Sequence, residues 1–317
     1  MTAPVRIGSR ASKLARTQTR QMQLRICAAL SAPPEDADRV APVTLITTTG
    51  DRIQDRRLLE LGGKQLFTKE IEEALLDGRV DCAVHSYKDM PAEAVPGLSI
   101  AAVPEREDPR DALVSPLYGG FDALPEAARL GTASLRRGAQ ARLRRPDLRV
   151  QLLRGNVDTR LAKLDGGEAD AAVLAAAGLR RLGLERHIRE LFDPVAQPPA
   201  PGQGALAIQT RTDDVDAPWV QALRCRRTAI AVAAERGALV ALEGSCRTAI
   251  GAHGRLDGEV LRLVIEALAP DGSDRWRREQ AHDMTGEPDP ESTAAALGLR
   301  LGLEIREEAG DRIVLGA

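Results

Sequence analysis

Short apolar runs alternate with amphipathic stretches over the first hundred residues. Three strands are predicted: buried strands over residues 5–8 and 80–85, and a β-branched strand over 43–48. Two helices are predicted beside them, over residues 12–30 and 70–76. Ser12 and Thr68 are the expected N-caps, because each is a hydroxyl residue placed before apolar positions at helical spacing. Strands that alternate with helices in this way predict a parallel sheet.

The same alternation returns after a charged connector with two prolines at residues 104–111. A strand is predicted at 129–130, and it leads through residues 131–134 into a helix that ends at Arg144. A strand at 148–153, a helix at 157–164 and a strand at 171–175 follow. Residues 7–12 and 130–136 also share a local pattern of strand, glycine, hydroxyl residues, arginine and helix. In both segments this pattern places the free N–H groups of a helix N-terminus and an arginine at the end of a strand.

The remainder of the chain has a different style. Residues 193–202 are rich in proline, as is typical of a linker. A helix is predicted from about residue 228 to 242, followed by extended segments with Asp-Gly hairpin turns at 257–258 and 271–272, and by a last helix at 291–308. This order predicts a small α+β domain at the C-terminus.

The expected fold class is therefore α/β, with two lobes built on mainly parallel sheets and a small α+β C-terminal domain. Three domains are expected. They are a discontinuous lobe 1 at residues 1–104 and 203–224, lobe 2 at 105–202, and a third domain at 225–317.

The chain has 317 residues with 44 basic and 46 acidic side chains, a formal net charge of −2. This balance points away from a general binder of nucleic acid or membrane surfaces. The N-terminus reaches Arg6 before any apolar run, and no stretch approaches the roughly 20 apolar residues of a membrane span. The cysteines and histidines have no metal-ligand spacing, and the four cysteines show no paired pattern. A cytoplasmic protein without a metal site is expected.

Arginine outnumbers lysine 39 to 5. A codon bias explains such a skew, and solvated helix faces are its plain structural interpretation. Five arginines nevertheless lie at predicted strand-to-helix turns: Arg10, Arg136, Arg137, Arg154 and Arg160. Ligands of open α/β sheets bind beyond the carboxyl ends of the strands, where helix N-termini favour anions and arginine grips carboxylates in a bidentate manner. The pattern predicts a cleft for a polyanionic small molecule.

Asp89 and Cys246 are the candidates for chemistry. Asp89 follows the strand that ends near His85, where a carboxylate suits acid–base work or the stabilisation of a cation, although a plain turn aspartate is the alternative. His85 itself is expected to be a core histidine. Cys246 lies in a small-residue loop beside an arginine, which favours a nucleophile or an attachment point, although Cys225 also lies among arginines.

The segment 202–207, Gly-Gln-Gly-Ala-Leu-Ala, fits the G-x-G-x-x-A pattern of dinucleotide-binding proteins. Prolines precede it where that pattern needs a strand, so a hinge returning to the first lobe is expected instead. The residues alone thus indicate an enzyme or binding protein with two cleft-forming lobes, an anionic ligand and an unknown reaction.

Together these residues resemble the porphobilinogen deaminase family, also called the hydroxymethylbilane synthases. The matching stretches occur in family order over nearly the whole chain, at residues 6–14, 62–70, 85–91, 105–112, 131–137, 153–161, 177–184, 202–205 and 242–246. The resemblance implies two lobes like type II periplasmic binding proteins around a cleft, with a cofactor-attachment domain at the C-terminus. It also implies an enzyme of tetrapyrrole (haem) biosynthesis that joins four porphobilinogen molecules head to tail, releases ammonia and gives hydroxymethylbilane.

The resemblance assigns roles to individual residues. Cys246 matches the cysteine that holds a dipyrromethane cofactor through a thioether, and Asp89 matches the catalytic aspartate, which stabilises the azafulvene cation left by ammonia and assists proton transfer. Positions that bind the carboxylates of the pyrrole chain match Arg10, Ser12, Lys88, Ser134, Arg136, Arg137, Arg154, Arg160 and Arg181. Lys64 and Phe67 match an active-site loop. A monomer without nucleic-acid or membrane partners is implied.

Four residues depart from the family pattern: Gln65, Ala133, Asp158 and Arg247. None of them replaces Asp89 or Cys246. Two alternatives belong to other functional classes. The first is a cytoplasmic organic-anion-binding protein without catalysis, which would not need the third domain. The second is a nucleic-acid binder, which is disfavoured because the chain has only seven aromatic residues and a net charge near zero.

Overall fold

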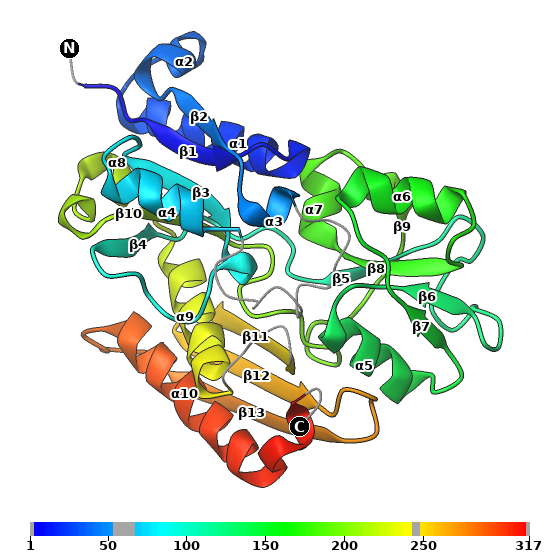
Figure 1. The fold of residues 1–317 in the computed structure, drawn as a ribbon. Helices are drawn as coiled ribbons and strands as arrows, with labels where there is room; N and C mark the ends of the chain where they lie inside the picture. The colour runs from blue at the N-terminus through cyan, green and yellow to red at the C-terminus, as the bar shows by residue number, and fades with distance from the viewer. Residues whose placement is uncertain (1–2, 53–66, 243–247, 315–317) are drawn as a thin grey trace. The chain divides into compact units, whose positions relative to one another are not determined.

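The structure, a computed structural model, describes residues 3–52, 67–242 and 248–314. They fall into two compact units. The first unit holds the described parts of Met1–Arg56, Gly63–Arg106 and Ala205–Ala229, and the second holds Glu107–Gly204 and the described parts of Ile230–Ala317. Among the described residues there is one sheet in the first unit and there are two in the second (Figure 1).

The sheet of the first unit has the strand order β2-β1-β3-β10-β4. Its strands are β1 (Ile7–Arg10), β2 (Val43–Ile46), β3 (Cys82–Ser86), β4 (Leu98–Ala102) and β10 (Leu206–Arg211). β2, β1 and β3 are parallel, whereas β10 runs antiparallel to both of its neighbours. One strand is therefore reversed in a sheet whose other described strands all point the same way.

Helices cover both faces of this sheet. They are α1 (Lys13–Ala29), α2 (Ala37–Val40), α3 (Thr49–Arg52), α4 (Lys69–Leu76) and α8 (Pro218–Gln221). Ile26 of α1 lies in one apolar cluster with Cys82, and Ile71 of α4 lies in another with Ala83. Because consecutive strand residues face opposite sides of a sheet, α1 and α4 cover opposite faces.

The first sheet of the second unit has the order β7-β6-β8-β5-β9. Its strands are β5 (Asp111–Val114), β6 (Arg129–Gly131), β7 (Arg149–Gln151), β8 (Ala171–Ala175) and β9 (Ile188–Leu191), and its helices are α5 (Leu135–Arg144), α6 (Val157–Asp165) and α7 (Ala176–Arg181). Here β5 is the reversed strand, antiparallel to β8 and β9. Ala141 of α5 clusters with Val173 and Leu161 of α6 clusters with Leu174, so these two helices also cover opposite faces.

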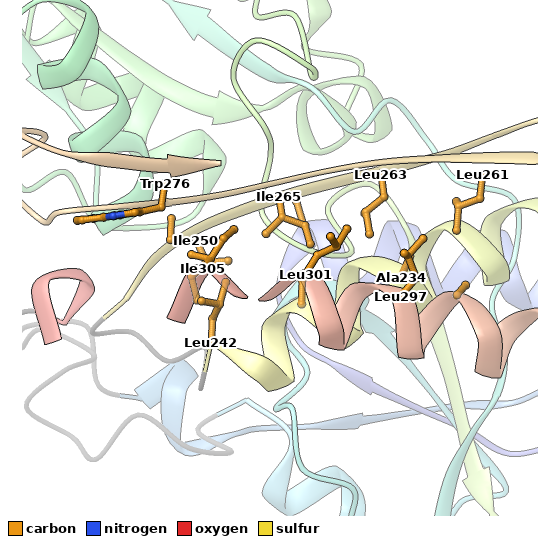
Figure 2. Packing of buried hydrophobic residues seen from close by; sticks show 14 of the residues in the cluster. Ala234, Leu242, Ile250, Leu261, Leu263, Ile265, Trp276, Leu297, Leu301 and Ile305 are labelled. Carbon is orange, nitrogen blue, oxygen red and sulfur yellow. The ribbon is translucent and has the colours of Figure 1, made fainter. Parts of the chain in front are cut away.

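The C-terminal sheet is antiparallel and three-stranded. It consists of β11 (Ala249–Asp257), β12 (Val260–Leu268) and β13 (Arg275–Asp283), and it packs against α9 (Arg226–Ala241) and α10 (Pro290–Ala309). Figure 2 shows side chains of the sheet, such as Ile250 and Leu263, meeting Leu301 and Ile305 of α10. The two helices approach closely, because a Cβ on Gly298 would lie 1.9 Å from the carbonyl oxygen of Ala234.

The expected fold class is confirmed: both α/β sheets are mainly parallel, and an α+β part with turns at Gly258 and Gly272 follows. Four strands of the two α/β sheets were not predicted: β4, β5, β9 and β10. β5 begins at the end of the charged connector, and β10 occupies part of the segment interpreted as a hinge. Ser12 caps its helix by accepting from the Ala15 N–H at 3.3 Å. Thr68 occupies the N-cap position of α4, as expected, but its side chain makes no capping hydrogen bond. The three-domain division stays a prediction.

The proline-rich stretch is less of a loose linker than its composition suggests. Pro198, Pro199 and residues 201–205 are buried. The Pro199 carbonyl accepts a hydrogen bond from the Ala252 N–H at 2.9 Å, so this segment is tied to β11. Prolines here lack only N–H donors, and their carbonyl oxygens remain available as acceptors.

Candidate functional site

Two parallel strands of the first unit end at the same edge of the sheet. β1 and β3 pair in parallel with Gly8 opposite Ala83, and each is followed by predicted site residues. Arg10 ends β1 and Ser12 follows it as the N-cap of α1, while Lys88 and Asp89 lie in the short 3-10 helix after β3. The structure therefore brings these four residues to one strand edge, as the pattern predicted.

The surroundings of this edge hold Arg10 and the end of β3 in place. The Arg10 guanidinium lies over the ring of Phe67, 4.2 Å from the ring centroid, in a cation–π contact. The Gln18 amide donates to the hydroxyl of Ser86 at 2.9 Å. Asp89 is exposed, and within the described ranges its carboxylate makes no hydrogen bond or ion pair. Lys64, the other predicted loop residue, lies outside the described residues.

His85 is a core histidine, as expected. It is buried on β3, and its Nε2 lies 3.1 Å from Oε1 of Gln209, whose amide donates to the buried carboxylate of Glu72 at 3.2 Å. Because the Gln209 amide gives its N–H to Glu72, its oxygen is left to accept from a protonated Nε2. Burial lowers the pKa of His85 to about 4, and Arg10 acts in the same direction against the Gln209 hydrogen bond. The imidazole is thus neutral at pH 7.

The second unit has a matching strand edge. β7, β6 and β8 are parallel neighbours, and their carboxyl ends lead into turns and helices that carry the predicted anion-binding residues. These are Ser134, Arg136 and Arg137 after β6, Arg154 and Arg160 after β7, and Arg181 after β8. Ser134 and Asn156 cap α5 and α6 by accepting from the backbone N–H three residues later. This edge therefore collects five arginines.

Arg136 and Arg137 are buried against an internal carboxylate. Arg136 Nη1 donates to Asp111 Oδ2 at 2.7 Å, and Arg137 Nη2 donates to Asp111 Oδ1 at 2.7 Å. Burial by itself would raise the pKa of Asp111, but the two guanidinium groups hold it well below its usual range. One anion thus faces two cations, and Arg136 Nε has no hydrogen-bond partner among the described residues.

Two other arginines of this edge donate hydrogen bonds to backbone carbonyl oxygens. Arg160 Nε donates to Gly155 O and Arg181 Nη2 donates to Gly204 O, both at 2.8 Å. Burial lowers the pKa of Arg181. Arg154 Nη1 is buried and, in the part of the chain that the structure describes, unpartnered. Orphaned cationic donors at a strand edge are what carboxylate ligands would satisfy.

Asp111 and Gln203 were not among the predicted site residues. Asp111 carries the arginine pair, and Gln203 joins it by donating to Asp111 Oδ1 at 2.9 Å and accepting from Arg137 Nη2 at 3.1 Å. The available signal for Asp111 was a charged residue directly before the apolar run 112–114, which indicates a buried strand that begins with a carboxylate. Gly204 does not serve a nucleotide-binding loop but allows a close backbone approach. Its φ is +86°, and a Cβ there would lie 2.3 Å from the Glu107 carbonyl oxygen.

Cys246 lies outside the described residues. Among the cysteines that are described, Cys27 and Cys82 are buried core residues, as expected, and burial raises the pKa of both thiols. Cys225 is half-buried, and its sulfur accepts from the Thr228 hydroxyl at 3.4 Å.

Comparisons with known proteins decide between the alternatives. The family model "Porphobilinogen deaminase, dipyromethane cofactor binding domain" matches residues 5–218, and "Porphobilinogen deaminase, C-terminal domain" matches residues 229–307. The chain belongs to the porphobilinogen deaminase family. It is 63% identical over 314 residues to "Porphobilinogen deaminase" of Phenylobacterium zucineum (strain HLK1) and 62% identical over 313 residues to that of Caulobacter sp. (strain K31), each match covering 98% of both chains.

Membership of the porphobilinogen deaminase family establishes the activity. The protein is a hydroxymethylbilane synthase, a transferase that condenses four porphobilinogen molecules head to tail with release of ammonia, and it uses a dipyrromethane cofactor. The family assignment selects this enzyme over the binding-protein and nucleic-acid alternatives. No helix among the described residues is long and apolar enough to cross a membrane.

Solved binding proteins are similar to the chain at low identity. A nutrient binding protein from Burkholderia cenocepacia bound to methionine is 15% identical with a TM-score of 0.42, over 69% of this chain and 89% of that one. The periplasmic aliphatic sulphonate binding protein SsuA from Escherichia coli is 15% identical with a TM-score of 0.38, over 76% of this chain and 70% of that one.

Proposed function

We propose that Asp89 is the catalytic carboxylate of the condensation. Loss of ammonia leaves positive charge on the substrate, and a fixed carboxylate lowers the free energy of that charge while also exchanging a proton. The observation that carries this proposal is the exposed Asp89 carboxylate at the end of β3, which is without an internal cation among the described residues. A carboxylate already committed to an ion pair, such as Asp111, would not be available for this task.

The donor set of both strand edges fits polycarboxylate ligands. Arg136 Nε and Arg154 Nη1 are buried cationic donors with no partner among the described residues, and each pyrrole of the substrate carries an acetate and a propionate. We infer that Arg136, Arg137, Arg154, Arg160 and Arg181, with Ser134 at the head of α5, bind carboxylates of the cofactor and substrate. Arg10, Ser12 and Lys88 do so at the other edge, with Lys64 and Phe67 as the adjoining loop.

We infer that Cys246 holds the cofactor through a thioether. When bound, the dipyrromethane supplies the free pyrrole carbon to which substrate is joined. The chain's own residues then have three tasks: the arginines bind and orient carboxylates, Asp89 holds or moves a proton, and Phe67 fixes the Arg10 guanidinium by stacking.

The test replaces the carboxylate while keeping its shape. In Asp89→Asn we expect turnover of porphobilinogen to fall by about 10²- to 10⁴-fold, the usual range for a lost general acid or base. Intact mass should still show the cofactor on the purified variant. Asp213→Asn, at an exposed aspartate of the same unit, is the matched control and should keep wild-type turnover. Normal turnover in Asp89→Asn would refute the assignment.

We propose that the protein acts in the cytoplasm as a monomer. Cys27, Cys82 and Cys225 are free thiols, which fits a reducing compartment. Sedimentation equilibrium at micromolar concentration should give the mass of one chain, and fractionation of cells should recover the activity with cytoplasmic markers. A dimer mass or recovery with the membranes would contradict this proposal.

A further inference from the structure

A carboxylate is buried in the C-terminal sheet. Glu266 lies on β12 with 1% of its surface exposed. Burial raises the pKa of Glu266. Its Oε1 accepts from Gln140 Nε2 at 3.0 Å, and its Oε2 lies 3.7 Å from Arg275 Nη1. Burying a carboxylate costs more free energy than burying an apolar side chain of similar size. Packing alone therefore does not explain a glutamate at this position.

Gln140 joins Glu266 to the arginine pair of α5. Its Nε2 group donates both to Glu266 Oε1 and to the Pro198 carbonyl oxygen at 2.9 Å, and its Oε1 accepts from Arg136 Nη1 at 2.8 Å. An amide has donors on one side and an acceptor on the other. Two acceptors facing Nε2 therefore fix the orientation that presents the oxygen to Arg136.

The guanidinium of Arg136 is held from one side only. The two N–H groups of Nη1 are shared among three acceptors, on Asp111, Gln140 and Pro198 O, the last at 3.1 Å, while the buried Nε has no partner among the described residues. Such an arrangement immobilises the group and leaves part of its donor capacity for a ligand.

Close backbone packing keeps this chain of contacts in register. A Cβ on Gly251, which pairs with Glu266 across β11 and β12, would lie 2.5 Å from Pro198 O. A Cβ on Gly272, in the turn after β12, would lie 2.7 Å from Ala139 O on α5. The C-terminal sheet thus contacts both α5 and the proline-rich segment, with no room for a side chain at either glycine.

We propose that Glu266 is a positioning residue for the condensation: through Gln140 it orients Arg136 toward a carboxylate of the pyrrole chain. This inference rests on the carboxylate-binding role proposed for Arg136. It makes the C-terminal sheet part of the anion-binding apparatus of the second unit, in addition to any role as the place of cofactor attachment.

The test compares Glu266→Leu with Glu266→Gln. In Glu266→Leu the melting temperature should fall moderately, because one N–H of Gln140 loses its acceptor, and this measurement separates stability from function. Its KM for porphobilinogen should rise roughly 5- to 20-fold, as expected for a lost hydrogen bond in a charged network. Glu266→Gln keeps an acceptor for Gln140 and should stay within about twofold of wild type. Glu279→Leu, on the exposed face of β13, is the control and should leave KM unchanged.

A second readout does not depend on turnover of the loaded enzyme. When the apoenzyme is incubated with porphobilinogen, intact mass follows how fast the cofactor is acquired, and Glu266→Leu should acquire it more slowly than Glu266→Gln. Gln140→Met breaks the same link and serves if Glu266→Leu fails to fold. Its effect on KM should not add to that of Glu266→Leu.

Distinct results overturn distinct claims. Wild-type KM and loading in Glu266→Leu, equal impairment in Glu266→Gln, or additive effects with Gln140→Met would each overturn the positioning role. Arg136→Leu separates this from the underlying proposal. If Arg136→Leu itself keeps wild-type KM and loading, the carboxylate-binding role of Arg136 fails, whereas impairment in Arg136→Leu alone defeats only the role of Glu266.

Discussion

Arg136 and Arg137 are neighbours on α5 and share one carboxylate partner, Asp111. The buried Nε of Arg136 has no hydrogen-bond partner among the described residues, so a ligand carboxylate would satisfy it. Asp111 limits the cost of burying both guanidinium groups when no ligand is bound. The pair is thereby both stably buried and suited to an anion.

At the same scale, His85 predicts an acid sensitivity of the fold. Its pKa of about 4 in the folded protein lies below the ordinary value of 6.5, so the unfolded chain takes up a proton first as the pH falls. The contribution is present above pH 6.5 and is lost progressively toward pH 4. Between pH 7 and pH 5 we expect the wild type to lose about 2 kcal/mol more stability than His85→Gln.

Urea unfolding at the two pH values measures this difference. His187→Gln, at a half-buried histidine of the second unit, is the control and should follow the wild type. Parallel losses of stability in the wild type and in His85→Gln would show that His85 does not titrate as the buried environment demands.

At the scale of elements, local patterning located most helices and most parallel strands but missed β4, β9 and both reversed strands. β5 and β10 each follow a charged or proline-containing segment, where local composition indicates a loop. Their place is set by partners distant in the chain, as when Ile208 of β10 pairs with Val84. Thr68 shows the same limit, since a residue type suited to capping does not ensure the cap geometry.

Some residues of the candidate site could be predicted from the sequence and others could not. Arginines at strand ends could be found from a sequence because the fold class fixes where strand ends point. Their partners could not, because Asp111 and Gln203 reach Arg137 only through tertiary packing, across 26 and 66 residues of chain. Glu266 gave no signal at all, being one of two charged residues, with Arg262, in an otherwise apolar strand.

The contact between α9 and α10 gives a prediction for these elements. In Gly298→Ala the new Cβ would meet the Ala234 backbone, which lies within α9 and cannot move aside without shifting the helix. We expect a loss of about 1–3 kcal/mol in the free energy of unfolding, the usual cost of overpacking. Gly119→Ala, where nothing lies within 4 Å of the added Cβ, is the control in the same denaturation experiment. Equal stabilities of the two variants would contradict the close helix contact.

At the scale of the whole molecule, the match to a curated relative covers 98% of the chain, and the two family models match residues 5–218 and 229–307. The family activity is therefore assigned to the whole chain and not to one lobe. We propose that the cofactor is itself built from the substrate, that Cys246 holds it and that the arginines bind its carboxylates. Loading of the cofactor is then a property of the intact chain.

Intact mass spectrometry before and after addition of porphobilinogen tests this central claim most directly. The purified wild type should exceed its sequence mass by one dipyrromethane and gain further pyrrole units with substrate, while Cys246→Ala should stay at its sequence mass throughout. A wild-type protein that has only its sequence mass, both before and after porphobilinogen, would contradict the account.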